Sequence, residues 1–143
     1  CDDITTADTP FIPGKANVMK EGTDVCIIAC GLMIPKALEA AAQLEKEGVS
    51  AAVVNMHTIK PIDKDIVLKM NETCKAIVTV EEHSVIGGLG SAVSEVLAGH
   101  DGAKFAMVGI QDKFGKSGKP DQLFEAYGLT AANVAAKAKE LLK

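Results

Sequence analysis

The sequence predicts an α/β domain with three layers, in which helices cover both faces of a doubly wound, mostly parallel β-sheet. Short apolar runs, such as residues 25–30 and 49–56, alternate along the chain with segments whose apolar residues recur at helical spacing. The runs are apolar at consecutive positions, which is typical of strands that are buried on both faces of a parallel sheet. Because crossovers between parallel strands are right-handed, the intervening helices are expected on both faces.

Five segments are predicted to be strands, namely residues 16–19, 25–30, 49–56, 76–80 and 105–110. They are short and mostly apolar, and turn residues separate several of them from the next element of the chain. The first two are separated only by a turn that contains Gly22, so they are expected to pair as a hairpin.

Helices are predicted between the strands from capping residues and apolar periodicity. Gly48 is the expected C-cap of the helix that begins at Ile34. Asp63 and Thr130 are the expected N-caps of the second and the last helix, and Pro120 is expected to begin a further helix. The third helix follows a glycine-rich segment.

Composition and charge describe a single globular domain. The chain has 143 residues, 48% of them hydrophobic, and residues 15–143 are predicted to form one domain after a linker or arm at residues 1–14. The net charge of −4 argues against nucleic acid as a partner, and the apolar runs are shorter than the ~20 residues that span a membrane. All 15 basic residues are Lys, so no Arg fork is available to bind a phosphate.

The four cysteines, Cys1, Cys26, Cys30 and Cys74, lack CxxC spacing. Cys26 and Cys30 lie in an apolar run, where free thiols are usually inert parts of the core. Free thiols fit a reducing compartment, so we expect a cytoplasmic protein. The chain begins at Cys1 without an initiator Met, and it is therefore expected to be part of a longer product.

Polar residues that follow strands are the candidates for function, because ligands of doubly wound sheets bind beyond the carboxyl ends of the strands. The densest cluster is Glu81, Glu82 and His83, whose carboxylates and imidazole could perform acid–base chemistry. Neighbouring strand residues point to opposite faces, so Glu81 and Glu82 need not act together. The alternative is that these groups form hydrogen bonds that shape the loop.

Three glycines, Gly87, Gly88 and Gly90, follow this cluster. They could let backbone amides approach an anion at the amino terminus of a helix. The dinucleotide-binding fingerprint fails, because Val93 stands where that motif requires Gly or Ala. The alternative is that small residues allow a tight turn and close packing of the helix on the sheet.

His57 and Asp112 complete the candidates, since each lies in a segment that follows a strand. His57, His83 and His100 lack the spacing of metal ligands. We therefore assign no catalytic, cofactor-binding or metal-binding residue, and regard the candidates as residues of an interface or an anion site.

Four stretches carry a family resemblance. They are GKANVMKEGTDVCIIACG at residues 14–31, VVNMHTIKPID at 53–63, VTVEEHSVIGGLGSAVSE at 78–95, and QDKFGKSG with LFEAYGLT between 111 and 130. Together they resemble the C-terminal domain of transketolases, and most closely the separately encoded C-terminal section of a split transketolase. The middle of the pattern is shared with deoxyxylulose-phosphate synthase and the β subunit of 2-oxoacid dehydrogenases, whereas DKFGKSG and YGLT favour transketolase.

The resemblance implies a five-stranded sheet with one antiparallel strand. It also implies that thiamine diphosphate and Mg²⁺ are bound by upstream domains or an N-terminal section, and not by this chain. The expected function is an assembly domain of a transketolase of the pentose phosphate pathway, dimeric in the complete enzyme and inactive alone. Two alternatives remain open: a domain that binds a small anion or effector at the glycine-rich turn, and a docking platform for another enzyme component.

Association is expected to use apolar residues that lie in or beside polar loops, because a monomer gains little from exposing them. These residues are Leu32, Met33, Ile59, Ile62, Val85 and Ile86.

Overall fold

A computed structural model describes residues 14–84, 88–110 and 128–143. The strands are β1 (Asn17–Lys20), β2 (Val25–Ala29), β3 (Ala51–Asn55), β4 (Ala76–Ser84) and β5 (Lys104–Ile110). The helices in these ranges are α1 (Ile34–Lys46), α2 (Lys64–Thr73), α3 (Leu89–Leu97) and α5 (Ala131–Leu141), and a short 3-10 turn, η1, spans Gly31–Met33.

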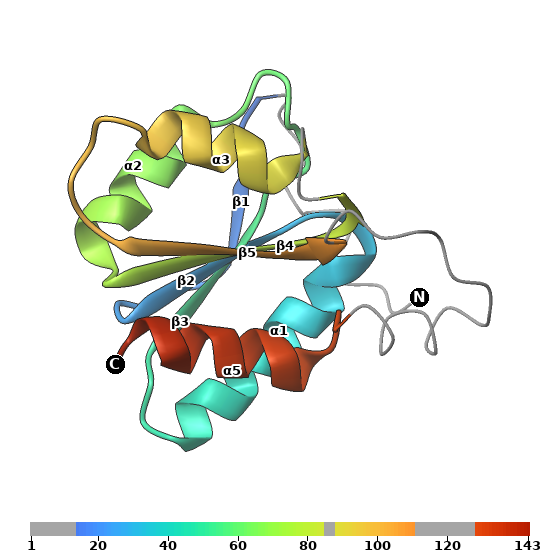
Figure 1. Ribbon diagram of the computed structural model, residues 1–143, viewed down its shortest axis with the longest axis vertical. Coiled ribbons are helices and arrows are strands. Elements are labelled where there is room, and N and C mark those ends of the chain that lie inside the picture. Colours follow the sequence, from blue (N-terminus) through green and yellow to red (C-terminus); the bar gives the residue numbers. More distant parts are fainter. Residues whose placement is uncertain (1–13, 85–87, 111–127) are drawn as a thin grey trace.

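The strands form one sheet in the order β1-β3-β2-β4-β5. β1 is antiparallel to β3, and the other neighbouring pairs are parallel. In Figure 1, α2 and α3 cover one face of the sheet, and α1 and α5 cover the other. The predicted three-layer α/β fold, with five strands and one antiparallel pair, is therefore confirmed.

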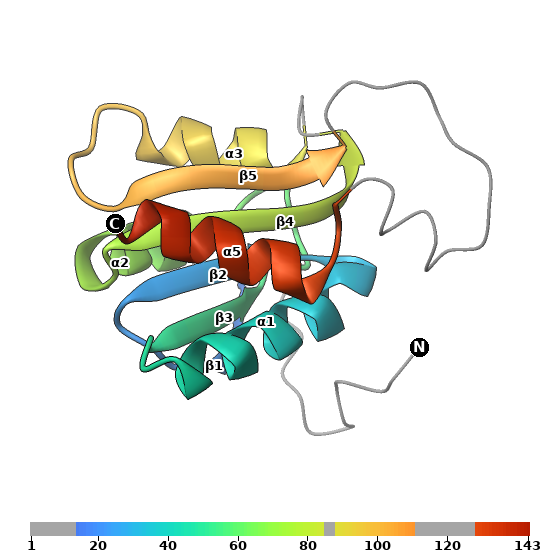
Figure 2. The same cartoon turned by 60° about the horizontal axis from the view of Figure 1, so that its bottom comes forward.

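Alternating residues of the central strands fill two separate cores. In β2, Val25, Ile27 and Ala29 belong to the core beneath α1 and α5, whereas Cys26 and Ile28 belong to the core beneath α2 and α3. All five are completely buried, which explains why β2 is apolar at every position. Figure 2 shows the layer of α1 and α5 in front of β2 and β4.

Three predicted capping residues lie at or next to helix ends. The Asp63 carboxylate accepts a hydrogen bond from the Ile66 amide at 3.3 Å, and the Thr130 hydroxyl accepts one from the Asn133 amide at 3.2 Å. Gly48 follows the end of α1 with a φ of 81°, a left-handed conformation that favours glycine. The two N-caps confirm the sequence prediction, whereas the C-cap of α1 is Glu47, one residue before the predicted Gly48.

The predicted hairpin between the first two strands is wrong. β1 pairs with β3, and Val18 lies opposite Val54. Both edges of β2 are occupied by the parallel strands β3 and β4, so β1 extends the sheet at the outer edge of β3. The turn that was expected to close the hairpin instead passes the start of β3, where a Cβ atom on Gly22 would overlap the backbone of Ala51 and Ala52.

Two sequence predictions concern residues beyond the described ranges. The helix expected to begin at Pro120 lies outside them, and so does the linker or arm up to residue 13. Within the described ranges, no helix is long and apolar enough to cross a membrane.

Candidate functional site

β4 places two carboxylates at the carboxyl edge of the sheet, in different surroundings. The strand continues to Ser84, beyond its predicted end. The pairing of β4 with β5 is irregular between Val80 and Ser84, where both glutamates lie. The Glu81 carboxylate is bonded to α3, whereas the Glu82 carboxylate lies beside Gly31. The two carboxylates are therefore not arranged as an acid–base pair.

The Glu81 carboxylate is hydrogen-bonded to the start of α3. Its Oε1 accepts from the Leu89 amide at 2.9 Å, and its Oε2 accepts from the Gly90 amide at 2.7 Å. The first amides of a helix have no partner within it, and the helix dipole favours a negative charge there. Glu81 is only 1% exposed, so it joins the end of β4 to α3 from within the core.

Gly90 lets α3 approach the sheet closely. A Cβ atom at this position would lie 2.7 Å from the Met107 Sδ and 3.0 Å from the Thr79 Oγ1. Thr79 is completely buried, and its hydroxyl has no hydrogen-bond partner among the described residues. The first turn of α3 is therefore held by contacts with β4 and β5, as well as by Glu81.

Glu82 lies beside the turn that follows β2. Its Oε1 is 3.7 Å from the position that a Cβ atom on Gly31 would take, and Gly31 has a left-handed φ of 58°. Cys30, the residue before this turn, is partly buried. Burial, together with the carboxylates of Glu81 and Glu82, raises the pKa of Cys30 to about 11, so the thiol is protonated at neutral pH.

η1 directs two neighbouring apolar residues to different environments. Leu32 is 46% exposed, whereas Met33 is completely buried in the core beneath α1. The expectation that Met33 contributes to an association surface is therefore wrong, because the turn packs it inside. Ile59 and Ile62 are half-buried against the core beneath α2 and α3.

The remaining candidates are only partly described. His57 follows β3, and its Nδ1 lies 3.1 Å from the Thr58 Oγ1. His83 belongs to β4, and Gly88 is the N-cap residue of α3. Gly87, Asp112, Val85 and Ile86 lie outside the described residues. The described part of the chain holds no group of three His, Cys, Asp or Glu side chains that could bind a metal ion.

A surface groove between α2, α3 and the loop before α2 was missed from the sequence. We call it the α2–α3 groove, and its volume is about 510 Å³. Its apolar lining includes Ile59, Ile62, Leu68 and Val96, and its polar lining includes Lys60, Lys64, Glu95 and His100. Ile59 and Ile62 are predicted from the sequence to serve association, and no signal in the sequence indicates a cavity.

Comparison with known protein families decides what kind of domain this is. A family model described as "Transketolase, C-terminal domain" matches residues 14–134. The chain belongs to this family. The resemblance inferred from the sequence stretches is therefore confirmed.

Several relatives of this transketolase C-terminal domain are also similar in sequence. The chain is 43% identical over 138 residues to the 6-deoxy-6-sulfo-D-fructose transketolase subunit SqwH of a Clostridium species, covering 96% of this chain and 43% of that protein. It is 45% identical over 130 residues to the 1-deoxy-D-xylulose-5-phosphate synthase of Heliobacterium modesticaldum, covering 90% of this chain and 20% of that protein.

A solved structure has the same fold. It is described as a split gene transketolase, inactive beta4 tetramer, and it matches with a TM-score of 0.93 and 48% identity. The match covers 99% of this chain and 46% of the other chain. This transketolase C-terminal domain thus spans less than half the length of the proteins that it matches.

Proposed function

We propose that the chain is the assembly domain of a thiamine diphosphate-dependent transketolase that transfers ketol groups between sugar phosphates in the cytoplasm. Alone it is inactive. The observation that carries this proposal is the family match over residues 14–134, combined with the short span of the chain on its relatives. The similar solved structure of a split transketolase is itself described as inactive, which supports the proposal.

The geometry at the carboxyl edge of the sheet favours an assembly role. Glu81, a candidate acid or base, is buried, and both of its oxygens accept hydrogen bonds from α3. Leu32 is exposed at the same edge, on the turn after the central strand β2. An exposed leucine beside a carboxylate that is bonded within the domain suits contact with another protein surface better than chemistry on a substrate.

The partner in this proposal is the section of the enzyme that binds thiamine diphosphate and Mg²⁺. Complete enzymes of the family use this cofactor, and the similar Clostridium protein is described as a subunit. We propose that the carboxyl edge of the sheet packs against that section, and that the complete enzyme is at least a dimer.

Anion binding at the glycine-rich turn is a weaker proposal. The amides of Leu89 and Gly90 already donate hydrogen bonds to Glu81. A phosphate that bound to these amides would have to displace the buried Glu81 carboxylate or lie beside it. Two neighbouring negative charges repel each other.

Calorimetric titration of the chain with thiamine diphosphate and Mg²⁺ tests the proposal. We expect no heat beyond dilution for the chain alone, and saturable binding once the cofactor-binding section is added. Inorganic phosphate serves as the control for the anion alternative. Saturable binding of thiamine diphosphate by the chain alone, with a micromolar Kd (a binding free energy of about −8 kcal/mol), would contradict the proposal that another section of the enzyme binds the cofactor.

A further inference from the structure

Glu82 differs from the other carboxylates that are partly or fully withdrawn from solvent. In the part of the chain that the structure describes, the buried and half-buried carboxylates are those of Asp24, Asp63, Glu81 and Glu82. The first three accept hydrogen bonds from backbone amides, at distances between 2.7 and 3.3 Å. The Glu82 carboxylate forms no hydrogen bond or ion pair with any described residue. The domain therefore leaves this half-buried charge without a partner.

The half-buried position of Glu82 matters for any surface that packs against it. A carboxylate that loses water without gaining a hydrogen bond carries a cost in free energy. In the chain alone, the exposed part of Glu82 keeps its contact with water, which limits this cost. A surface that covered Glu82 would remove that water, and the cost would rise unless the surface supplied a partner for the charge.

Glu82 lies beside the exposed turn at the proposed assembly edge. Its Oε1 is 3.7 Å from the position that a Cβ atom on Gly31 would take, and Gly31 is exposed. Leu32, the next residue of the turn, is the one large hydrophobic residue of the described ranges that is exposed. We call these residues the Leu32–Glu82 patch. A protein surface that receives Leu32 must also approach the Glu82 carboxylate.

The charge of the Leu32–Glu82 patch is negative. The nearby Glu81 charge is already offset by two amides at the positive end of the α3 dipole. The ion pairs in the described ranges join lysines to other carboxylates. Cys30 adds no positive charge, because burial and the two neighbouring carboxylates raise the pKa of its thiol to about 11. The Glu82 charge thus remains uncompensated by the described residues.

We propose that the cofactor-binding section of the enzyme presents a basic side chain, Lys or Arg, to Glu82 and an apolar pocket to Leu32. This inference rests on the proposed assembly function and adds the chemistry of the partner surface. The ion pair fixes the orientation of the two sections, and Leu32 supplies apolar contact area. A second copy of the chain does not fit this patch, because a symmetric contact would bring two unpaired Glu82 carboxylates together.

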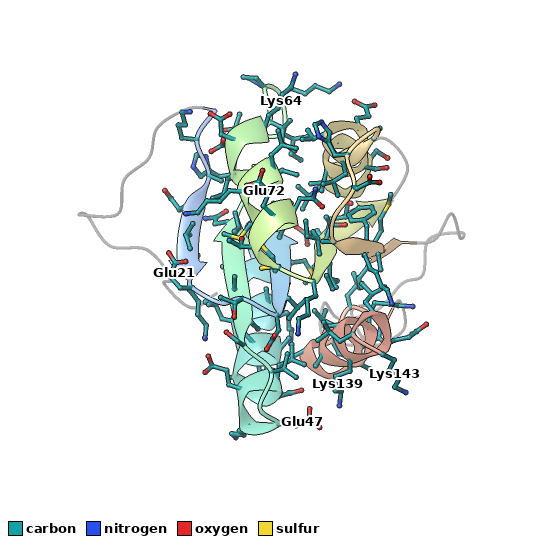
Figure 3. The ribbon with its side chains drawn as sticks, turned by 90° about the vertical axis from the view of Figure 1, so that its left-hand side faces the viewer. Glu21, Glu47, Lys64, Glu72, Lys139 and Lys143 are labelled. Atoms are coloured by element: carbon teal, nitrogen blue, oxygen red, sulfur yellow. The ribbon has the colours of Figure 1, made fainter. Side chains whose placement is uncertain are left out.

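Charge variants of Glu82 test this proposal through the Kd of the complex with the cofactor-binding section, measured by calorimetric titration. Glu82→Gln keeps an acceptor oxygen but removes the charge, and it should weaken the complex at least tenfold. Glu82→Lys should weaken it further, because two positive charges then meet. The matched control Glu72→Gln removes the charge of an exposed carboxylate on α2 and should leave the Kd within twofold. Figure 3 views the opposite edge of the sheet and shows Glu72 there.

The salt dependence of the complex gives a second readout, which the loss of an uncharged contact would not change. The Kd of the wild-type complex should rise when NaCl increases from about 50 to about 500 mM, because salt screens the attraction between charges. The Glu82→Gln complex should show a smaller rise, since it lacks one of the two charges. The Glu72→Gln complex should show the same rise as the wild type.

Failure of this proposal can be distinguished from failure of the assembly function. If the wild-type chain forms no complex with the cofactor-binding section, both are wrong. If the complex forms and Leu32→Glu weakens it, but Glu82→Gln binds within twofold of the wild type, the assembly function stands and the basic partner group is wrong. Equal salt dependence of the wild-type and Glu82→Gln complexes would also overturn the proposal. A circular dichroism melt of each variant confirms that it is folded before its binding is compared.

Discussion

The Glu81 Oε2 lies 2.7 Å from the Gly90 amide nitrogen, and this hydrogen bond joins the end of a central strand to the start of the helix that comes after it. A second bond from the Leu89 amide engages the other carboxylate oxygen. These two bonds join the end of β4 to the first turn of α3. Glu81, which the sequence offers as a candidate acid or base, thus stabilises the fold.

Removing the Glu81 carboxylate should destabilise the chain. Glu81→Ala leaves two helix-terminal amides without their partner inside the core, which we expect to lower the free energy of unfolding by about 3 kcal/mol. Urea unfolding followed by circular dichroism measures this change. The matched control Glu82→Ala removes the neighbouring carboxylate, which is not bonded to α3, and should cost less than about 1 kcal/mol. Equal losses in the two variants would contradict the structural role of Glu81.

The close approach of α3 to the sheet predicts an unusual effect of an alanine in a helix. Replacing an interior helical glycine with alanine normally stabilises a helix by up to about 1 kcal/mol. Gly90→Ala should instead destabilise the chain by about 1–2 kcal/mol, because the new methyl group meets Met107 and Thr79. In a double-mutant cycle, Met107→Ala should recover part of this loss. A more stable Gly90→Ala variant would show that the helix packs less closely.

The buried Thr79 hydroxyl offers a substitution that should increase stability. Thr79→Val keeps the shape of the side chain and removes a hydroxyl that has no partner among the described residues. We expect the free energy of unfolding to rise by about 1 kcal/mol, because a buried polar group without a hydrogen bond carries a desolvation cost. Differential scanning calorimetry would show this as a higher Tm, and a lower Tm would indicate that the hydroxyl has a partner.

The raised pKa of Cys30 predicts slow alkylation. At pH 8 a thiol with a pKa of about 11 contains on the order of a hundredfold less thiolate than an unperturbed cysteine. Iodoacetamide labelling, resolved by peptide mass mapping, should be slow at pH 8 and should accelerate up to about pH 11. Since the Glu82 carboxylate helps to raise this pKa, Glu82→Gln should shift the profile to lower pH, whereas Glu95→Gln should leave it unchanged. A profile centred near pH 8.5 would contradict the buried, anionic environment of Cys30.

Most of the fold could be predicted because the apolar runs and the caps act locally. Asp63 and Thr130 cap helices as their neighbouring sequence indicates. The hairpin prediction was wrong because strand pairing depends on residues that are distant in sequence. β2 pairs on both sides with parallel strands, β3 and β4, which the chain reaches only after intervening helices. No signal within the turn at Gly22 distinguishes a hairpin from a chain that passes the start of another strand.

The environments of the site residues were harder to predict than the location of the site. The carboxyl end of β4 was identified, but its polar residues made the strand look shorter than it is. Glu81 can continue a buried strand because α3 supplies hydrogen bonds to its carboxylate, and that contact depends on tertiary structure. Likewise, only the turn of η1 shows that Leu32 is exposed and that Met33 is buried.

Sedimentation velocity tests the central claim most directly. It should be run over a hundredfold concentration range, with the chain alone and with the section of the enzyme that binds thiamine diphosphate. We predict a monomer or a weak dimer for the chain alone, and a stable complex when that section is present. Leu32→Glu should weaken the complex at least tenfold without altering the melting temperature of the chain, because Leu32 is 46% exposed. A tight dimer of the chain alone, or no complex with the cofactor-binding section, would contradict the account.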